Sequence, residues 1–117
     1  MKKDPTVFIK HISESIKRIE EFTKGVSRKD FIGSVQLQDA VIRRIEVIGE
    51  ATKNLPNKFT KKHPEVPWNK MARTRDKLIH GYFGVDLDLT WDIVKKDLPD
   101  IKKKIKKILK EIEKNKT

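Results

Sequence analysis

The sequence predicts an all-α protein, an up-down bundle of four or five helices in a single domain covering residues 1–117. Apolar residues recur every three or four positions along most of the chain, which is the period of a helix, and no segment alternates with the period of a strand. The 117 residues include only 5 glycines. A chain of this length supports one domain with a modest core, and we expect residues 113–117 to form a frayed basic tail.

The first helix is expected to begin at Asp4 and Pro5, an N-cap followed by a proline in the first helical turn, and to end at Gly25. Ser27 then caps a short turn that runs through Phe31. The apolar stripe of the first helix comprises Phe8, Ile9, Ile12, Ile16, Ile19 and Phe22.

A long second helix is expected from about Ser34 to Asn54. Gly49 stands in its middle, where glycine costs about 1 kcal/mol relative to alanine, so we expect another helix to approach closely there. The stripe of this helix comprises Leu37, Val41, Ile45, Ile48, Ala51 and Leu55, widened by Val35 and Ile42.

Prolines divide residues 56–67, which we interpret as a loop with one helical turn. A third helix is expected from Trp68 to about His80, and a fourth from a cap at Asp88 to about Asp97. Pro99 either kinks this fourth helix or begins a fifth. The last stripe comprises Ile101, Ile105, Ile108, Leu109 and Ile112.

Charge and composition narrow the function. The net charge of +11, from 28 basic and 17 acidic residues, favours polyanionic partners: RNA, DNA or an acidic membrane. No cysteine is present, and no histidine has a neighbour at metal-ligand spacing, so we expect no metal and no cofactor. No apolar run is long enough to span a bilayer or serve as a secretory signal, which favours a cytoplasmic protein.

Arg75 is the unusual residue of the third helix. On a helical wheel it lies about 20° from the centre of an apolar arc that includes Trp68 and Met71. Burying an unpaired charge is costly, so Arg75 requires a carboxylate partner, a phosphate-sized ligand or an open cleft. Glu46 and Glu50 of the second helix are the candidate carboxylates.

His80 follows five positions later, about 140° from Arg75 on an ideal helix. Both side chains can meet at one point only if the helix unwinds near Gly81 or if a second copy of the chain completes the site. Asp76 is four residues before His80 and could orient its imidazole, and Tyr82 returns to the face of Arg75. These groups suit a phosphate-handling site, but ordinary interface residues could also give this pattern.

The string "RDKLIHGY", from Arg75 to Tyr82, matches the Arg-x4-His-x-Tyr motif of HEPN-domain ribonucleases. The chain specifically resembles the HepT toxin family, whose partner is a minimal nucleotidyltransferase antitoxin. The resemblance covers nearly the whole chain, through the segments "AVIRRIEVIGEATKNLP", "VPWNKMARTRDKLIHGYFGVD" and "WDIVKKDLPDIKKKI".

This resemblance implies a HEPN bundle that forms a homodimer and cleaves RNA without a metal ion, with the 2′-hydroxyl as the nucleophile. Arg75 and His80 would be the catalytic residues, with Asp76 and Tyr82 in supporting roles. The resemblance also implies that the antitoxin attaches AMP to Tyr82. A non-catalytic subunit that binds a nucleotide or a partner protein is the alternative.

Two further features of the sequence bear on its partners and its core. The lysine-rich segment 102–116 has a strongly basic face, which is typical of a solvated surface but also of a surface that binds RNA, a membrane or a partner helix. Trp68 and Trp91 occupy helical core positions, and we expect both to be buried.

Overall fold

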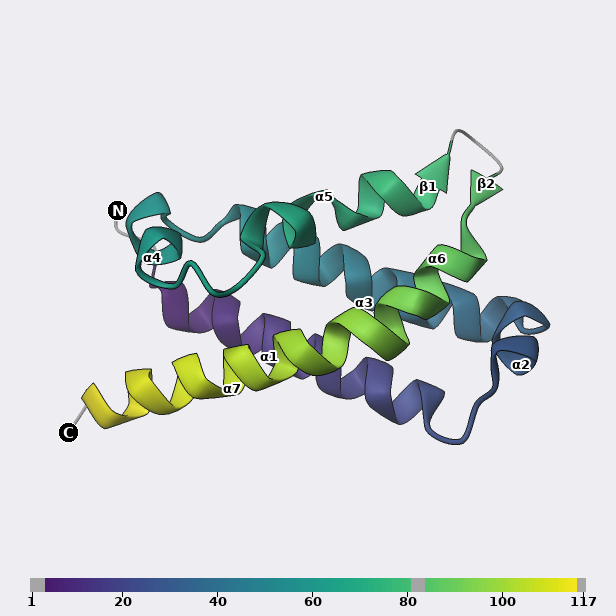
Figure 1. The fold of residues 1–117 in the computed structure, drawn as a ribbon, viewed down its shortest axis with the longest axis horizontal. Coiled ribbons are helices and arrows are strands. Elements are labelled where there is room, and N and C mark those ends of the chain that lie inside the picture. Colours follow the sequence, from purple (N-terminus) through teal and green to yellow (C-terminus); the bar gives the residue numbers. More distant parts are fainter. Residues whose placement is uncertain (1–3, 81–83, 116–117) are drawn as a thin grey trace.

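The computed structural model describes residues 4–80 and 84–115, and it is built almost entirely of helices. This confirms the predicted all-α up-down bundle (Figure 1). The elements are α1 (Pro5–Thr23), α2 (Arg28–Ile32), α3 (Val35–Lys53), α4 (Asn57–Lys62), α5 (Trp68–Leu78), β1 (Ile79–His80), β2 (Gly84–Val85), α6 (Leu87–Asp92), the π-helical segment η1 (Ile93–Asp97) and α7 (Leu98–Asn115). No helix among these residues is long and apolar enough to cross a membrane.

Local capping signals set the helix boundaries of the N-terminal half. Asp4 accepts a hydrogen bond from the backbone N–H of Thr6 at the start of α1, and Ser34 accepts one from Leu37 at the start of α3. Ser27 forms a capping box with Asp30 in front of α2. The chain turns after α1 at Gly25, whose φ of +71° is in the region that glycine tolerates best. These boundaries confirm the predictions.

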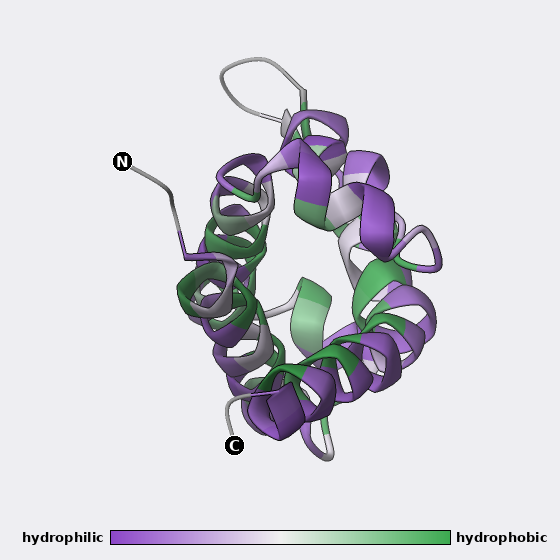
Figure 2. Ribbon diagram, turned by 90° about the vertical axis from the view of Figure 1, so that its left-hand side faces the viewer, coloured by the Kyte–Doolittle hydropathy of each residue, from purple (hydrophilic) through white to green (hydrophobic). Residues whose placement is uncertain are grey.

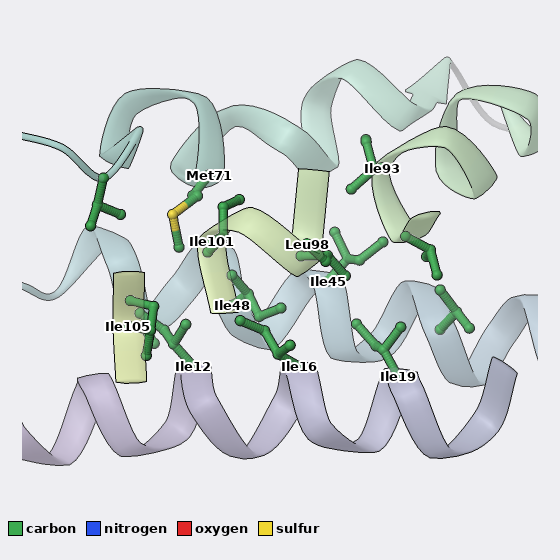
Figure 3. Close-up of a cluster of buried hydrophobic side chains, with 14 of the residues drawn as sticks. Ile12, Ile16, Ile19, Ile45, Ile48, Met71, Ile93, Leu98, Ile101 and Ile105 are labelled. Carbon is green, nitrogen blue, oxygen red and sulfur yellow. The ribbon is translucent and has the colours of Figure 1, made fainter. Parts of the chain in front are cut away.

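The long helices alternate in direction (Figure 1), and α3 packs between α1 and α5, while α7 packs against α1. Figure 2 shows the hydrophobic residues on the inner faces of the helices. The core cluster in Figure 3 joins Ile12, Ile16 and Ile19 of α1 to Ile45 and Ile48 of α3, Met71 of α5, Ile93 of η1, and Leu98, Ile101 and Ile105 of α7. Trp68 and Trp91 are also buried in this core, as predicted.

The C-terminal third differs from the prediction in two ways. Asp86, rather than Asp88, caps α6, because its carboxylate accepts the backbone N–H of Leu89 at 2.9 Å. A π-helical turn precedes Pro99, in which the N–H of Leu98 donates to the carbonyl of Ile93, and α7 begins at Leu98 directly after this turn. This wider turn accommodates a proline that has no N–H to donate, so α6, η1 and α7 run on as one helix.

The end of α7 also differs from expectation, since the helix continues to Asn115, beyond the expected start of the frayed tail at residue 113. Leu109 and Ile112 are partly buried against the core and hold this last part of the helix in place.

Candidate active site

The helix that carries the candidate site, α5, lies close against α3. A Cβ atom added to Gly49 of α3 would stand 3.5 Å from the carbonyl oxygen of Met71 and 3.7 Å from that of Ala72. The close helix approach predicted from Gly49 is therefore confirmed. This contact sets the distance between α5 and α3 just before Arg75.

Arg75 forms an ion pair with Glu46 across these two helices. Its Nε donates to Oε2 of the carboxylate at 2.8 Å, and the two side chains are 49% and 29% exposed. Neither terminal nitrogen of Arg75 has a partner among the described residues. Glu50, the other candidate carboxylate, instead pairs with Lys53 at 3.6 Å. One of the two anticipated salt bridges is thus present, but it leaves much of the guanidinium in solvent.

The expectation that Arg75 sits near the centre of a buried arc is wrong. The face of α5 that enters the core is centred on Met71 and Leu78, which are 3% and 0% exposed. On a helical wheel this centre lies about 50° from Arg75. The predicted arc was centred on Trp68, but Trp68 is buried at the edge of that face, near the start of the helix. Arg75 therefore stands on the flank of α5 that faces Glu46.

The third helix is two residues shorter than predicted, since α5 ends at Leu78 and His80 belongs to β1. Ile79 has extended backbone angles (φ −100°, ψ 110°) and pairs with Val85 in an antiparallel ladder, while His80 pairs with Gly84. The N–H of Asp86 donates to the carbonyl of Leu78 at 2.8 Å and closes the base of this hairpin. Strand pairing thus ends the helix before His80.

The end of α5 at Leu78 changes how Arg75 and His80 are related in space. The separation of about 140° applies only if Arg75 and His80 share one helix, and they do not. The same fact removes the helical i, i+4 basis for Asp76 to orient His80. Asp76 is exposed on α5. The side chain of His80 and the whole of Tyr82 lie outside the described residues, so their predicted roles stay predictions.

A second charged cluster joins α2 to α6. Arg28 of α2 donates to Asp88 at 2.8 Å and to Asp92 at 2.7 Å, both on α6. The hydrogen bond that Arg28 donates lowers the pKa of Asp92, and the hydrogen bonds that Asp92 and Asp88 accept raise the pKa of Arg28. This cluster could not be predicted from the sequence, because the two carboxylates are 60 and 64 positions from Arg28.

The described residues include no group of three or more histidine, aspartate or glutamate side chains arranged to hold a metal ion. The chemistry that they do offer is that of a partly exposed guanidinium. Its Nε is engaged by a carboxylate, and its two terminal nitrogens can form paired hydrogen bonds with a phosphate.

Comparison with known proteins identifies several relatives. The chain is 50% identical over 110 residues to "Probable ribonuclease HepT" of Thermococcus cleftensis, covering 94% of this chain and 100% of that protein. It is 56% identical over 116 residues to "Gamma-glutamylcyclotransferase and putative RNase" of Methanocaldococcus jannaschii, covering 99% of this chain and 52% of that protein. The chain thus spans about half the length of the second relative. No solved structure matches it.

The names of these relatives indicate the class of protein, which is a ribonuclease. Residues 12–108 match a family described as "Ribonuclease HepT-like". The chain belongs to the HepT-like ribonuclease family, as its resemblance to that family predicted.

Proposed function

We propose that the chain is a metal-independent endoribonuclease and the toxin of a pair whose antitoxin is a minimal nucleotidyltransferase. Membership of the HepT-like family supports the reaction class. The observation that carries the proposal for this site is the placement of Arg75. A guanidinium held at Nε by Glu46, with both terminal nitrogens without a partner among the described residues, is suited to bind an RNA phosphate.

In the proposed reaction, the 2′-hydroxyl of the RNA attacks the adjacent phosphorus as its proton passes to a base. The bond to the 5′-oxygen of the next nucleotide breaks, and that oxygen takes up a proton. The products are a 2′,3′-cyclic phosphate and a 5′-hydroxyl. His80 would transfer these protons, since an unperturbed imidazole has a pKa of about 6.5. Arg75 would stabilise the negative charge that builds on the phosphate oxygens.

We also propose that the active form is a homodimer in which two copies of the site share one cleft. Arg75 is 49% exposed, so its own chain leaves it open to solvent. A second copy would supply the opposite wall and exclude water, which strengthens the interaction between guanidinium and phosphate. Size measurement in solution by light scattering tests this, and a monomer with full activity would contradict it.

The test of the reaction is incubation of purified chain with RNA in EDTA. Arg75→Ala and His80→Ala should abolish cleavage while the helical circular dichroism signal is retained. Matched controls are Arg73→Ala, an exposed arginine of the same helix, and His11→Ala, an exposed histidine of α1; both should cleave as the unaltered chain does. Full cleavage by His80→Ala would overturn the catalytic assignment. Binding of RNA without cleavage by the unaltered chain would instead favour a non-catalytic binding subunit.

The proposed control by the antitoxin is AMP attachment to Tyr82. Added bulk and negative charge two residues from His80 would compete with an RNA phosphate for Arg75. Mass spectrometry after co-expression with the nucleotidyltransferase should find AMP-sized additions on the peptide that contains Tyr82, and none after Tyr82→Phe. An unmodified Tyr82 beside an active nucleotidyltransferase would contradict this part of the proposal.

A further inference from the structure

The outer face of α7 is a strongly basic surface. Residues 98–115 include seven lysines and three acidic residues. The buried residues of this helix point into the bundle, and five lysines occupy about 100° of arc on the opposite side, with no acidic residue between them on the helical wheel. Four of them, which we call the α7 lysine stripe, are Lys103, Lys106, Lys107 and Lys110; the fifth, Lys114, is near the end of the helix and has an interaction of its own.

The lysines of the α7 lysine stripe differ from the lysines beside them in their ion pairing. Lys102 pairs with Glu20 of α1 at 2.9 Å, and Lys104 pairs with Asp100 at 2.9 Å. By contrast, all four lysines of the stripe are exposed and have no ion pair or hydrogen bond with any other described residue. The flanking lysines therefore hold the helix to the bundle or to itself, and the stripe presents its charges outward.

The apolar side of α7 is packed into the core. Ile101, Ile105 and Ile108 are 5%, 1% and 1% exposed, and Figure 2 shows the hydrophobic side of this helix turned inward. A helix that lies in a membrane surface must insert its apolar face between the lipids. In the folded chain that face is not available, so a polyanion that needs only charge fits the stripe better than a lipid bilayer does.

We propose that the α7 lysine stripe binds the phosphate backbone of RNA at a second place, away from the cleavage site; this inference rests on the proposed ribonuclease function. Successive lysines on this face are about one helical turn, or 5 to 6 Å, apart, so the stripe follows a strand over about 10 Å. Figures 1 and 2 place α7 on the other side of the bundle from α5 and the β1–β2 pair. The stripe therefore contacts nucleotides other than the one that is cut.

Binding of single-stranded RNA at several salt concentrations tests the stripe directly. The test variant replaces Lys103, Lys106, Lys107 and Lys110 with glutamine. Each lost phosphate contact lowers the slope of log affinity against log salt by about 0.7, so the variant should lose about 3 from this slope. The matched control replaces the same number of exposed lysines elsewhere, Lys10, Lys58, Lys61 and Lys62, and should lose much less. Equal slopes for the two variants would overturn the proposal.

RNA length separates this inference from the proposed reaction. Because the stripe and the cleavage site lie on different sides, an RNA of about 8 nucleotides should be cut equally by the unaltered chain and the stripe variant. With RNA of about 40 nucleotides, the stripe variant should show a raised KM and an unchanged kcat. An equal rise in KM for both lengths would overturn the inference. Loss of cleavage in Arg75→Ala, with a salt slope lowered by no more than the about 0.7 of one phosphate contact, would support it.

Vesicles of phosphatidylserine and phosphatidylcholine provide the remaining comparison. If the stripe variant loses vesicle binding and keeps the RNA affinity and salt slope of the unaltered chain, the stripe is a membrane surface and the RNA proposal fails. Weak vesicle binding that is equal in both proteins agrees with the proposal.

Discussion

The side chain of Arg75 reaches across from α5 to Glu46 of α3, and Nε and Oε2 meet at 2.8 Å. This pair uses the side of the guanidinium and leaves its outer edge for another ligand. The carboxylate thus has two opposing effects on an RNA phosphate. It positions the guanidinium, and it also places a negative charge near the binding site.

Two substitutions of Glu46 separate these effects. Glu46→Gln keeps an oxygen to accept the Nε hydrogen bond and removes the charge, so we expect kcat to hold and KM for RNA to fall. Glu46→Ala removes both, and a poorly positioned Arg75 should lower kcat by roughly 10- to 100-fold. Steady-state kinetics on one RNA substrate measures the difference. Equal kcat values for the alanine and glutamine variants would show that Glu46 does not position Arg75.

Gly49 gives a prediction about stability at the same helix pair. Alanine fits there, because its Cβ would lie 3.5 Å from the nearest α5 oxygen, an ordinary contact distance. Gly49→Ala should therefore raise the free energy of unfolding by up to about 1 kcal/mol, through better helix propensity. Gly49→Leu would push α5 away and should lower the free energy of unfolding by about 1–3 kcal/mol. Urea unfolding measures both, and a similar loss in the two variants would contradict this account.

Phe31 holds the short α2 to the bundle. Its side chain is 0% exposed and its ring centroid lies 5.2 Å from that of Trp91. Phe31→Ala should lower the free energy of unfolding by about 3–5 kcal/mol, because it leaves a cavity in the core. The neighbouring Ile32 is 44% exposed, and Ile32→Ala should change this free energy by only about 0.5 kcal/mol. Equal losses in the two variants, measured in denaturant, would contradict the packing described.

The cluster of Arg28, Asp88 and Asp92 predicts a pH dependence. Because the Arg28 hydrogen bond lowers the pKa of Asp92 from the ordinary value of 3.8, the folded state gains stability above that pH and loses it as the pH falls through the lowered pKa. Arg28→Gln should therefore lower Tm slightly at pH 7, with the difference shrinking as the pH falls below 3.8 and through the lowered pKa of Asp92. Lys29→Gln makes the same charge change at an exposed neighbour and should lack this effect. A Tm difference between the two variants that persists at low pH would contradict it.

The sequence was sufficient wherever the structural signal was local. Asp4, Ser27 and Ser34 cap helices within three residues of themselves, so their chemistry is visible in a short window of sequence. The close helix approach at Gly49 could also be predicted, because a glycine in the middle of a helix is costly and needs a packing reason. The family resemblance added the reaction class, which no periodicity in the chain contains.

The candidate site depended on contacts that are distant along the chain. The rotation of α5 about its own axis is set by packing against α3, so the helical wheel alone placed Arg75 too far inward. The end of α5 is set by pairing of Ile79 with Val85, and the apolar spacing through residue 79 gave no sign of it. The π-helical turn before Pro99 likewise reflects the packing of a long helix, and the proline alone suggested a break.

The stop of α5 at Leu78 has one more consequence. The spacing between Arg75 and His80 depends on where a helix gives way to a two-residue strand, and neighbouring residues of a strand face opposite sides. A single residue inserted between Leu78 and Ile79 would either lengthen the path from Arg75 to His80 or shift the ladder by one position, which exchanges the two sides of the strand. A shifted ladder would also move Ile79, which packs partly buried against the core. The toxin chemistry that we propose and the packing of Ile79 both depend on chain length at this one junction.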